Sequence, residues 1–200
     1  LEEEFAAADA FLSRAFDGVP LHLCPGNHDA YVPIPWPRSL GRLDRFMTGF
    51  RQGDPDRRAP KDAADFPYAV DIGPARLVAA NSSPPTAGAV SRRKALDDRE
   101  ALMATLERVG VDLVLHGHAH VAHFGELMAP GGPAPVVGGA SLSHPRGGGD
   151  KTPGRYNLFT LEKRPGGFRL DLDVRQYVPE TGGVASVERR VYDLPRSTSI

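Results

Sequence analysis

The chain has little cysteine, little net charge and no long apolar run. Cys24 is the only cysteine in 200 residues, which excludes an internal disulfide framework and a cysteine-rich zinc site. No apolar run approaches the roughly 18 residues of a transmembrane helix. The formal net charge of -1 argues against a dedicated nucleic-acid surface, because phosphate binding needs clustered Lys and Arg. These absences fit a cytoplasmic protein that neither spans a membrane nor binds nucleic acid.

The residues that are present are ordinary for a folded domain. Hydrophobic residues make up 40% of the chain and charged residues 24%, as in globular proteins generally. A length of 200 residues allows one domain with a substantial core, whereas two full domains would fit only tightly. We therefore predict a single domain over residues 1–200, of mixed α/β (α+β) structure.

Hydrophobic spacing predicts the helices and strands of this mixed fold. Apolar residues recur at helical intervals over 2–16, and the acidic residues of its first turn suit the helix dipole. We expect a short helix at 40–50 and a longer one at 97–109, ended by Gly110. The expected strands span 19–24, 68–72, 75–80, 111–115, 156–163 and 168–178, and the expected loops include 51–65 and 130–154.

The first candidate site follows the predicted strand at 19–24. Gly26 permits a tight turn and a close backbone approach. Asn27 offers a carbonyl oxygen as a neutral metal ligand, and His28 offers an imidazole that can donate or accept a proton near neutral pH. Asp29 could orient that imidazole by accepting a hydrogen bond. Taken alone, the four residues also fit an ordinary turn, because Asn and Asp favour turns.

The second candidate site follows the predicted strand at 111–115. Gly117 allows a sharp bend, and a single small residue separates His118 from His120. Side chains at i and i+2 of extended backbone project to the same side, so we expect both imidazoles to face one metal cluster. Taken alone, the pair also fits a polar strand end whose histidines face solvent.

Both motifs stand where ligands gather in open α/β sheets, beyond the carboxyl ends of strands. Gly-Asn-His-Asp at 26–29, then a helix and a strand, then Gly-His-x-His at 117–120, resembles the calcineurin-like metallophosphoesterases. Residues 138–141 and 156–158 are also similar to C-terminal strands of that family. The resemblance implies a β-sandwich flanked by helices, and a hydrolase that uses two divalent metal ions (Mn, Fe or Zn).

The resemblance also implies roles for individual residues. Asn27 and His118 would bind one metal ion and His120 the other. His28 and Asn27 would contact the phosphate of a small-molecule phosphoester, with His28 as the acid towards the leaving group and Asp29 fixing its tautomer. The two metals would activate a water for in-line attack. A general likeness to cyclic-nucleotide phosphodiesterases favours a phosphodiester substrate, and phosphomonoesterase or nuclease activity stays open as an alternative.

The chain departs from the family pattern in its ligand count. The Asp-x-His and Gly-Asp-x-x-Asp motifs of the family are absent, and no histidine lies between His28 and His116 to supply a further ligand. We expect that residues are missing before Leu1 and near 87–92. His116 is interpreted as a neighbour of the site, since the family needs no ligand there. If the sequence is whole, three candidate ligands are too few for a dinuclear centre, and the alternative is a non-catalytic fragment or pseudoenzyme that keeps the scaffold.

Overall fold

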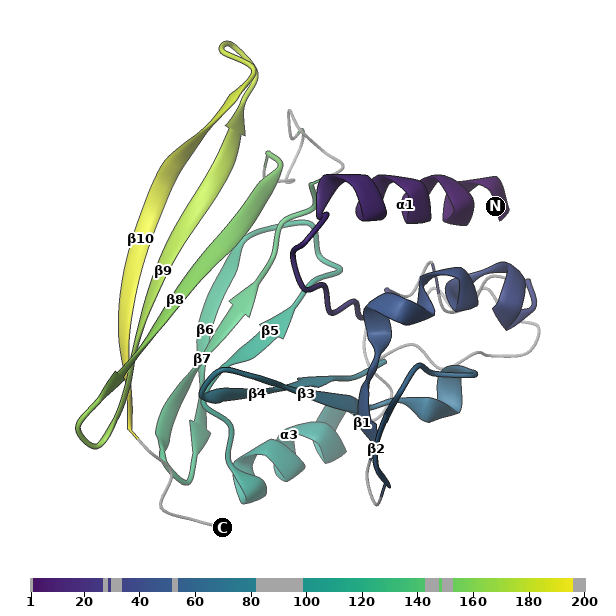
Figure 1. Ribbon diagram of the computed structural model, residues 1–200. Helices are drawn as coiled ribbons and strands as arrows, with labels where there is room; N and C mark the ends of the chain where they lie inside the picture. Colours follow the sequence, from purple (N-terminus) through teal and green to yellow (C-terminus); the bar gives the residue numbers. More distant parts are fainter. Residues whose placement is uncertain are drawn as a thin grey trace. The chain divides into compact units, whose positions relative to one another are not determined.

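The fold is taken from a computed structural model of the chain. It is of mixed α and β structure, as predicted, with most of its regular structure in sheets. The chain divides into two compact units, Leu1–Leu96 and Asp97–Ile200, coloured purple to blue and teal to yellow in Figure 1. The single domain over 1–200 stays a prediction, because compact units can belong to one domain. The structure describes residues 2–26, 29, 34–51, 54–81, 99–142, 148 and 153–195.

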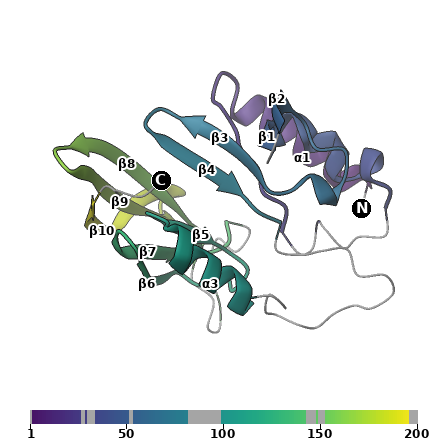
Figure 2. The same cartoon turned by 90° about the horizontal axis from the view of Figure 1, so that it is seen from below.

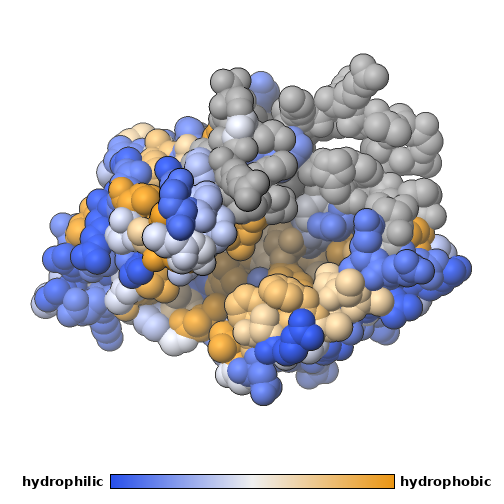
Figure 3. Space-filling model, turned by 90° about the horizontal axis from the view of Figure 1, so that it is seen from above, coloured by the Kyte–Doolittle hydropathy of each residue, from blue (hydrophilic) through white to orange (hydrophobic). Residues whose placement is uncertain are grey.

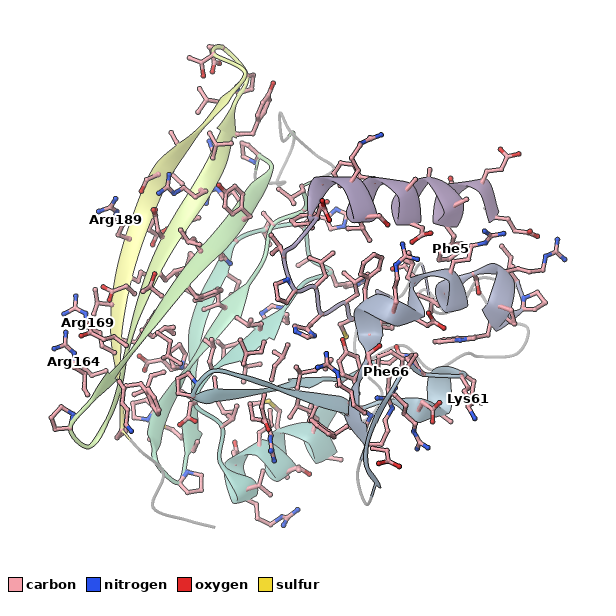
Figure 4. The ribbon with its side chains drawn as sticks, in the orientation of Figure 1. Phe5, Lys61, Phe66, Arg164, Arg169 and Arg189 are labelled. Carbon is pink, nitrogen blue, oxygen red and sulfur yellow. The ribbon has the colours of Figure 1, made fainter. Side chains whose placement is uncertain are left out.

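The first unit begins with a helix that packs on a 3-10 helix. The predicted first helix is confirmed as α1, Glu2–Ala15, and the short helix expected at 40–50 forms as the 3-10 helix η2, Leu40–Met47. Phe5 points from α1 toward η2 (Figure 4) and is buried with Leu40 and Leu43. Among the described residues, no helix has the length and apolar character needed to cross a membrane. Shorter 3-10 helices form at Trp36–Arg38 (η1) and Ala63–Asp65 (η3).

The first unit also contains a four-stranded sheet. Its central hairpin joins β3, Tyr68–Ile72, to β4, Ala75–Ala79, which confirms two predicted strands. Gly73 in their turn has a φ of 55°, a left-handed conformation that glycine adopts without strain. Tyr68 and Val70 point to the buried face of the sheet, toward the core that contains Phe5.

Two strands of this sheet lie where the sequence favours a helix end and a loop. β1, Gly49–Arg51, pairs with β3 through Phe50 and Ala69, and β2, Asp54–Arg58, pairs with the other edge of β1, giving the order β2-β1-β3-β4. The loop predicted over 51–65 is therefore wrong for β2. The charged residues and the proline of this segment favour a loop, but both are tolerated in β2 because it is an edge strand.

Residues 19–24, all of them described, form no strand, although the sequence predicts a buried one. The Leu23 N–H donates to the carbonyl of Phe46, 2.8 Å away in η2, so this bond belongs to no strand ladder. The hydroxyl of Tyr68 donates to the carbonyl of Leu23 at 2.6 Å. These two bonds tie the segment to η2 and β3 without pairing it as a strand.

The second unit ends in a long antiparallel sheet, in the order β10-β9-β8. The sequence predicts its first two strands and the hairpin between them but not the third. Its outer face is mostly hydrophilic, at the left of Figure 3, and Arg164, Arg169 and Arg189 point away from it (Figure 4). Its strands span Arg155–Arg164 (β8), Gly167–Val178 (β9) and Gly183–Pro195 (β10).

A shorter sheet in the same unit has the order β5-β7-β6. β5 (Val114–His116) runs parallel to β7 (Gly132–Gly138), and β6 (His123–Ala129) runs antiparallel to it. The predicted helix before this sheet is confirmed as α3, Arg99–Val109, and it lies against the sheet (Figure 2). It ends before Gly110, whose φ is 87°.

Two expectations for the shorter sheet need correction. The strand predicted at 111–115 starts later and ends at His116. The loop predicted over 130–154 contains β7, although Pro133 and Pro135 favour a loop. β5 pairs only with residues 136–138, so each proline has a single neighbouring strand, β6. A proline is tolerated there because no ladder hydrogen bond is needed on its other side.

Apolar side chains from both sheets form one buried cluster. Val137 of β7 packs with Leu172 and Val174 of β9, and none of the three is more than 1% exposed. Strand alternation turns these side chains toward each other, and burying each contributes about 1.5–3 kcal/mol. The cluster fixes β7, and with it the edge of the sheet where β7 and β5 end.

Candidate functional site

The carboxyl ends of β5 and β7 lie at the same edge of their sheet as the start of β6. The strand pairing requires this, because His116, the last residue of β5, and His123, the first residue of β6, are both register partners of Gly138, the last residue of β7. His118 and His120 lie on the short connection from β5 to β6. The structure therefore brings four histidines of the second unit, His116, His118, His120 and His123, to one end of this sheet, which is called the sheet edge below.

His118 and His120 adopt left-handed backbone conformations. Their φ angles are 80° and 59°, a region that costs a residue with a side chain about 1–2 kcal/mol. The expectation that extended backbone projects both side chains to one side is therefore wrong. β5 ends at His116 because its partner strand ends at Gly138, and the chain turns immediately afterwards. Strained backbone of this kind persists where the surrounding structure holds it, often at functional sites.

Two glycines make room for the imidazoles of His116 and His123. A Cβ on Gly138 would lie 2.8 Å from Cε1 of His116 and 3.0 Å from Cβ of His123, and one on Gly125 would lie 3.1 Å from Cε1 of His123. The two rings have centroids 5.7 Å apart and planes inclined by 55°. Sequence reasoning missed His123, because its relation to His116 depends on the register that both share with Gly138.

Residues 117–122, which connect β5 to β6 and carry His118 and His120, are called the histidine loop below. His116 also contacts the first residue of this loop. Its carbonyl oxygen accepts a hydrogen bond of 2.8 Å from the N–H of Gly139. Its ring Nδ1 lies 3.3 Å from the carbonyl oxygen of Gly117. A carbonyl oxygen can only accept, so this bond requires the proton on Nδ1.

The first motif belongs to the other unit, and the structure describes its two ends. The N–H of Gly26 donates to Oδ2 of Asp29 at 3.0 Å, and the N–H of Asp29 donates to the carbonyl of Gly26 at 3.2 Å. Asp29 therefore closes a turn on Gly26. Asn27 and His28 lie outside the described residues, so their metal and phosphate contacts, and the pairing of Asp29 with His28, stay predictions.

The segment that leads to this motif is anchored by long-range hydrogen bonds. Besides the bond from Tyr68 to Leu23, Cys24 Sγ donates to the carbonyl of Ala80 at 2.6 Å. Desolvation raises the pKa of the Cys24 thiol. Burial, reinforced by the neighbouring Cys24, raises the pKa of Tyr68 to about 12. Both groups are therefore neutral near pH 7 and act as anchors; the sequence does not reveal them because the partners are 45 and 56 residues apart.

A shallow cavity of about 280 Å³ opens on the sheet of the first unit. It contains none of the predicted site residues. The Arg51 guanidinium lies 5.4 Å from the centre of the Tyr68 ring, and Arg76 is paired with Asp71. Both arginines that line the cavity therefore already contact residues of the sheet. The cavity is lined by Phe50, Arg51, Pro67, Tyr68, Ala69, Arg76 and Val78.

The donor chemistry of the histidine loop suits a divalent metal ion. Imidazole nitrogens suit Zn and Fe, whereas carbonyl and carboxylate oxygens suit Mn. Within the described ranges, no group of three or more His, Cys, Asp or Glu side chains is placed to hold a metal ion, so a full ligand set would need further residues. No protein-family model, curated protein or solved structure matches the chain. Any function assigned to it therefore rests on its own residues and their arrangement.

Proposed function

We propose that the chain belongs to a metal-dependent phosphoester hydrolase, a phosphodiesterase of the calcineurin-like metallophosphoesterase type. The observation that carries the proposal is the sheet edge at the ends of β5 and β7, where His118 and His120 stand in left-handed backbone. Ligands collect beyond the carboxyl ends of parallel strands. The buried cluster between the two sheets of the second unit supports the sandwich that this family implies.

His118 and His120 would hold the divalent ions, with Asn27 as a further ligand. Two imidazoles and an amide oxygen suit Mn, Fe or Zn. When bound, the metal pair would polarise the phosphate and help the attacking water to lose a proton. The loop is held to Gly139 through the carbonyl of His116, so the two imidazoles are presented from a fixed strand end. A fixed donor set loses less freedom when it binds.

His28 would contact the phosphate and protonate the leaving group. Asp29 would hold it ready for this step. Oδ2 of Asp29 is engaged by the Gly26 N–H, so its other carboxylate oxygen, Oδ1, would accept the hydrogen bond from the His28 imidazole. A carboxylate in this position selects one imidazole tautomer.

A non-catalytic scaffold is the alternative class. The observation that favours it is the donor count: no trio of His, Cys, Asp or Glu gathers in the described part of the chain. A pseudoenzyme of this kind would keep the two packed sheets and lose hydrolysis.

Hydrolysis of bis(4-nitrophenyl) phosphate with added Mn²⁺ separates the two classes. The hydrolase predicts turnover that EDTA removes and that His120→Ala abolishes. Lys163→Ala, an exposed position on β8, serves as the matched control and should keep full activity. Equal turnover by His120→Ala and the unaltered protein would overturn the assignment of this ligand. No turnover at any Mn²⁺ concentration would favour the scaffold.

A further inference from the structure

We infer that His116 is a positioning residue for the loop of His118 and His120, and that Gly138 and His123 hold its ring in place. The inference deepens the proposed function and rests on it, because the loop matters for the ligands it carries. His116 itself binds no metal in this scheme. It acts through the backbone of Gly117.

Gly138 leaves the space that the His116 ring occupies. A Cβ on Gly138 would come within 2.8 Å of Cε1 and 3.0 Å of Nε2 of that ring, so the imidazole lies directly against the glycine. The Cβ of His123 would lie 3.0 Å from the same added atom, and the ring centroids of His116 and His123 are 5.7 Å apart. Gly138 is buried, and a Cβ added there would lie too close to the His116 ring for that ring to stay in place.

The two ring nitrogens of His116 have different neighbours. Nε2 lies on the Gly138 side of the ring, and Nδ1 lies 3.3 Å from the carbonyl oxygen of Gly117. The ring therefore bridges the end of β7 and the first residue of the loop. This bridge needs the proton on Nδ1, because the Gly117 oxygen has none to give.

The bridge lies directly before the two proposed ligands in the sequence. His118 and His120 hold φ angles of 80° and 59°, which side-chain-bearing residues do not keep unless neighbouring contacts impose them. The loop starts at Gly117, where an added Cβ would meet no other atom within 4 Å, so the position is open. The hydrogen bonds that act there include Gly139 N–H to the His116 carbonyl and the His116 ring to the Gly117 carbonyl. Removing the second leaves the Gly117 carbonyl without the contact that the His116 ring supplies.

Two pairs of variants of the 200-residue protein test the contacts of the His116 ring with Gly138 and Gly117. Gly138→Ala pushes on the ring, whereas Gly139→Ala is its matched control, since a Cβ there would lie an ordinary 3.8 Å from the His116 oxygen. His116→Leu removes the Nδ1 donor, whereas His116→Asn restores an N–H at about the position of Nδ1. The second pair stays informative if Gly138→Ala does not fold.

NMR supplies a readout that does not depend on metal or activity. Long-range imidazole ¹⁵N spectra report the tautomer of His116, and HN–Hα couplings with Cβ shifts report φ at His118 and His120. We expect the proton on Nδ1 in the unaltered protein. The φ-sensitive signals of both histidines should move in Gly138→Ala and His116→Leu and stay in Gly139→Ala and His116→Asn. A proton on Nε2, or signals that stay in all four variants, would overturn the inference.

Mn²⁺ titration then distinguishes the inference from the proposed function. Where the unaltered chain binds Mn²⁺, His116→Leu should weaken binding about 10- to 100-fold, as loss of a supporting contact does at metal sites, and His116→Asn should restore most of it. Equal affinity for the Leu and Asn variants would overturn the positioning role. If the unaltered chain binds no Mn²⁺, the proposed function fails, and the NMR result alone decides whether His116 positions the loop.

Discussion

The imidazoles of His116 and His123 have centroids 5.7 Å apart, and a Cβ on Gly138, their shared register partner, would lie 2.8 Å from Cε1 of His116. One residue from each strand of the shorter sheet thus meets in a single row at its edge. The loop that carries His118 and His120 leaves from this row. Contacts between the strands set the backbone conformation of this loop. Substitutions in the loop should therefore change the free energy of unfolding.

Replacing His118 tests its left-handed backbone. His118→Gly and His118→Ala both remove the imidazole, but only glycine accepts a φ of 80° without strain. We expect the glycine variant to be more stable than the alanine variant by about 1 kcal/mol in urea unfolding. Ala104→Gly in the exposed interior of α3 is the control, where the order reverses by about 1 kcal/mol. An alanine variant at 118 as stable as the glycine variant would contradict the backbone conformation.

Tyr68 makes stability depend on alkaline pH. Burial, with Cys24 next and Arg51 opposing both, raises its pKa from 10.0 to about 12. The phenol of Tyr68 therefore keeps its proton to a higher pH in the folded state than in the unfolded state. Its contribution to the free energy of unfolding is complete below pH 10 and is lost as the pH rises to about 12. The total loss is about 2–3 kcal/mol for two pH units.

Tyr68→Phe isolates this contribution. Below pH 10 the variant should be less stable by about 1 kcal/mol, because it lacks the hydrogen bond to the Leu23 carbonyl. Above pH 10 the difference between the two proteins should shrink, as measured by denaturant unfolding from pH 8 to 12. Curves that stay parallel over this range would show that Tyr68 does not titrate between those values.

The buried cluster between the two sheets is tested by truncating one leucine in it. Leu172→Ala removes a side chain that is 1% exposed, so it should cost about 2–5 kcal/mol. Leu158→Ala on β8, where the side chain is 49% exposed, is the matched control and should cost about 1 kcal/mol or less. Similar losses for the two variants, measured by thermal or urea unfolding, would contradict packing between the sheets.

Local sequence pattern was enough for the elements that carry their own signals. The helical spacing before Ala15, the turn at Gly73 and the stop at Gly110 all correspond to observed boundaries. Local pattern failed where a neighbouring strand decides. β2 and β7 contain prolines and are strands because of their positions in the sheets. β10 was missed because a bulge between Ser186 and Glu188 breaks the alternation that marks a strand.

The candidate site was predictable in place but not in conformation. The sequence puts His118 and His120 just after a strand, and the structure agrees with that position. Their left-handed backbone depends on where β7 ends, which is set by pairing between residues that are 22 positions apart, His116 and Gly138. Asn27 and His28 lie outside the described residues, and their roles stay predictions.

The proposed hydrolase depends on metal binding by His118 and His120. Mn²⁺ and Zn²⁺ would be titrated calorimetrically into the 200-residue protein, into His118→Ala and His120→Ala, and into Lys163→Ala as control. The account predicts saturable binding to the unaltered and control proteins that is lost in both histidine variants. Binding that is unchanged when either histidine is replaced would contradict it.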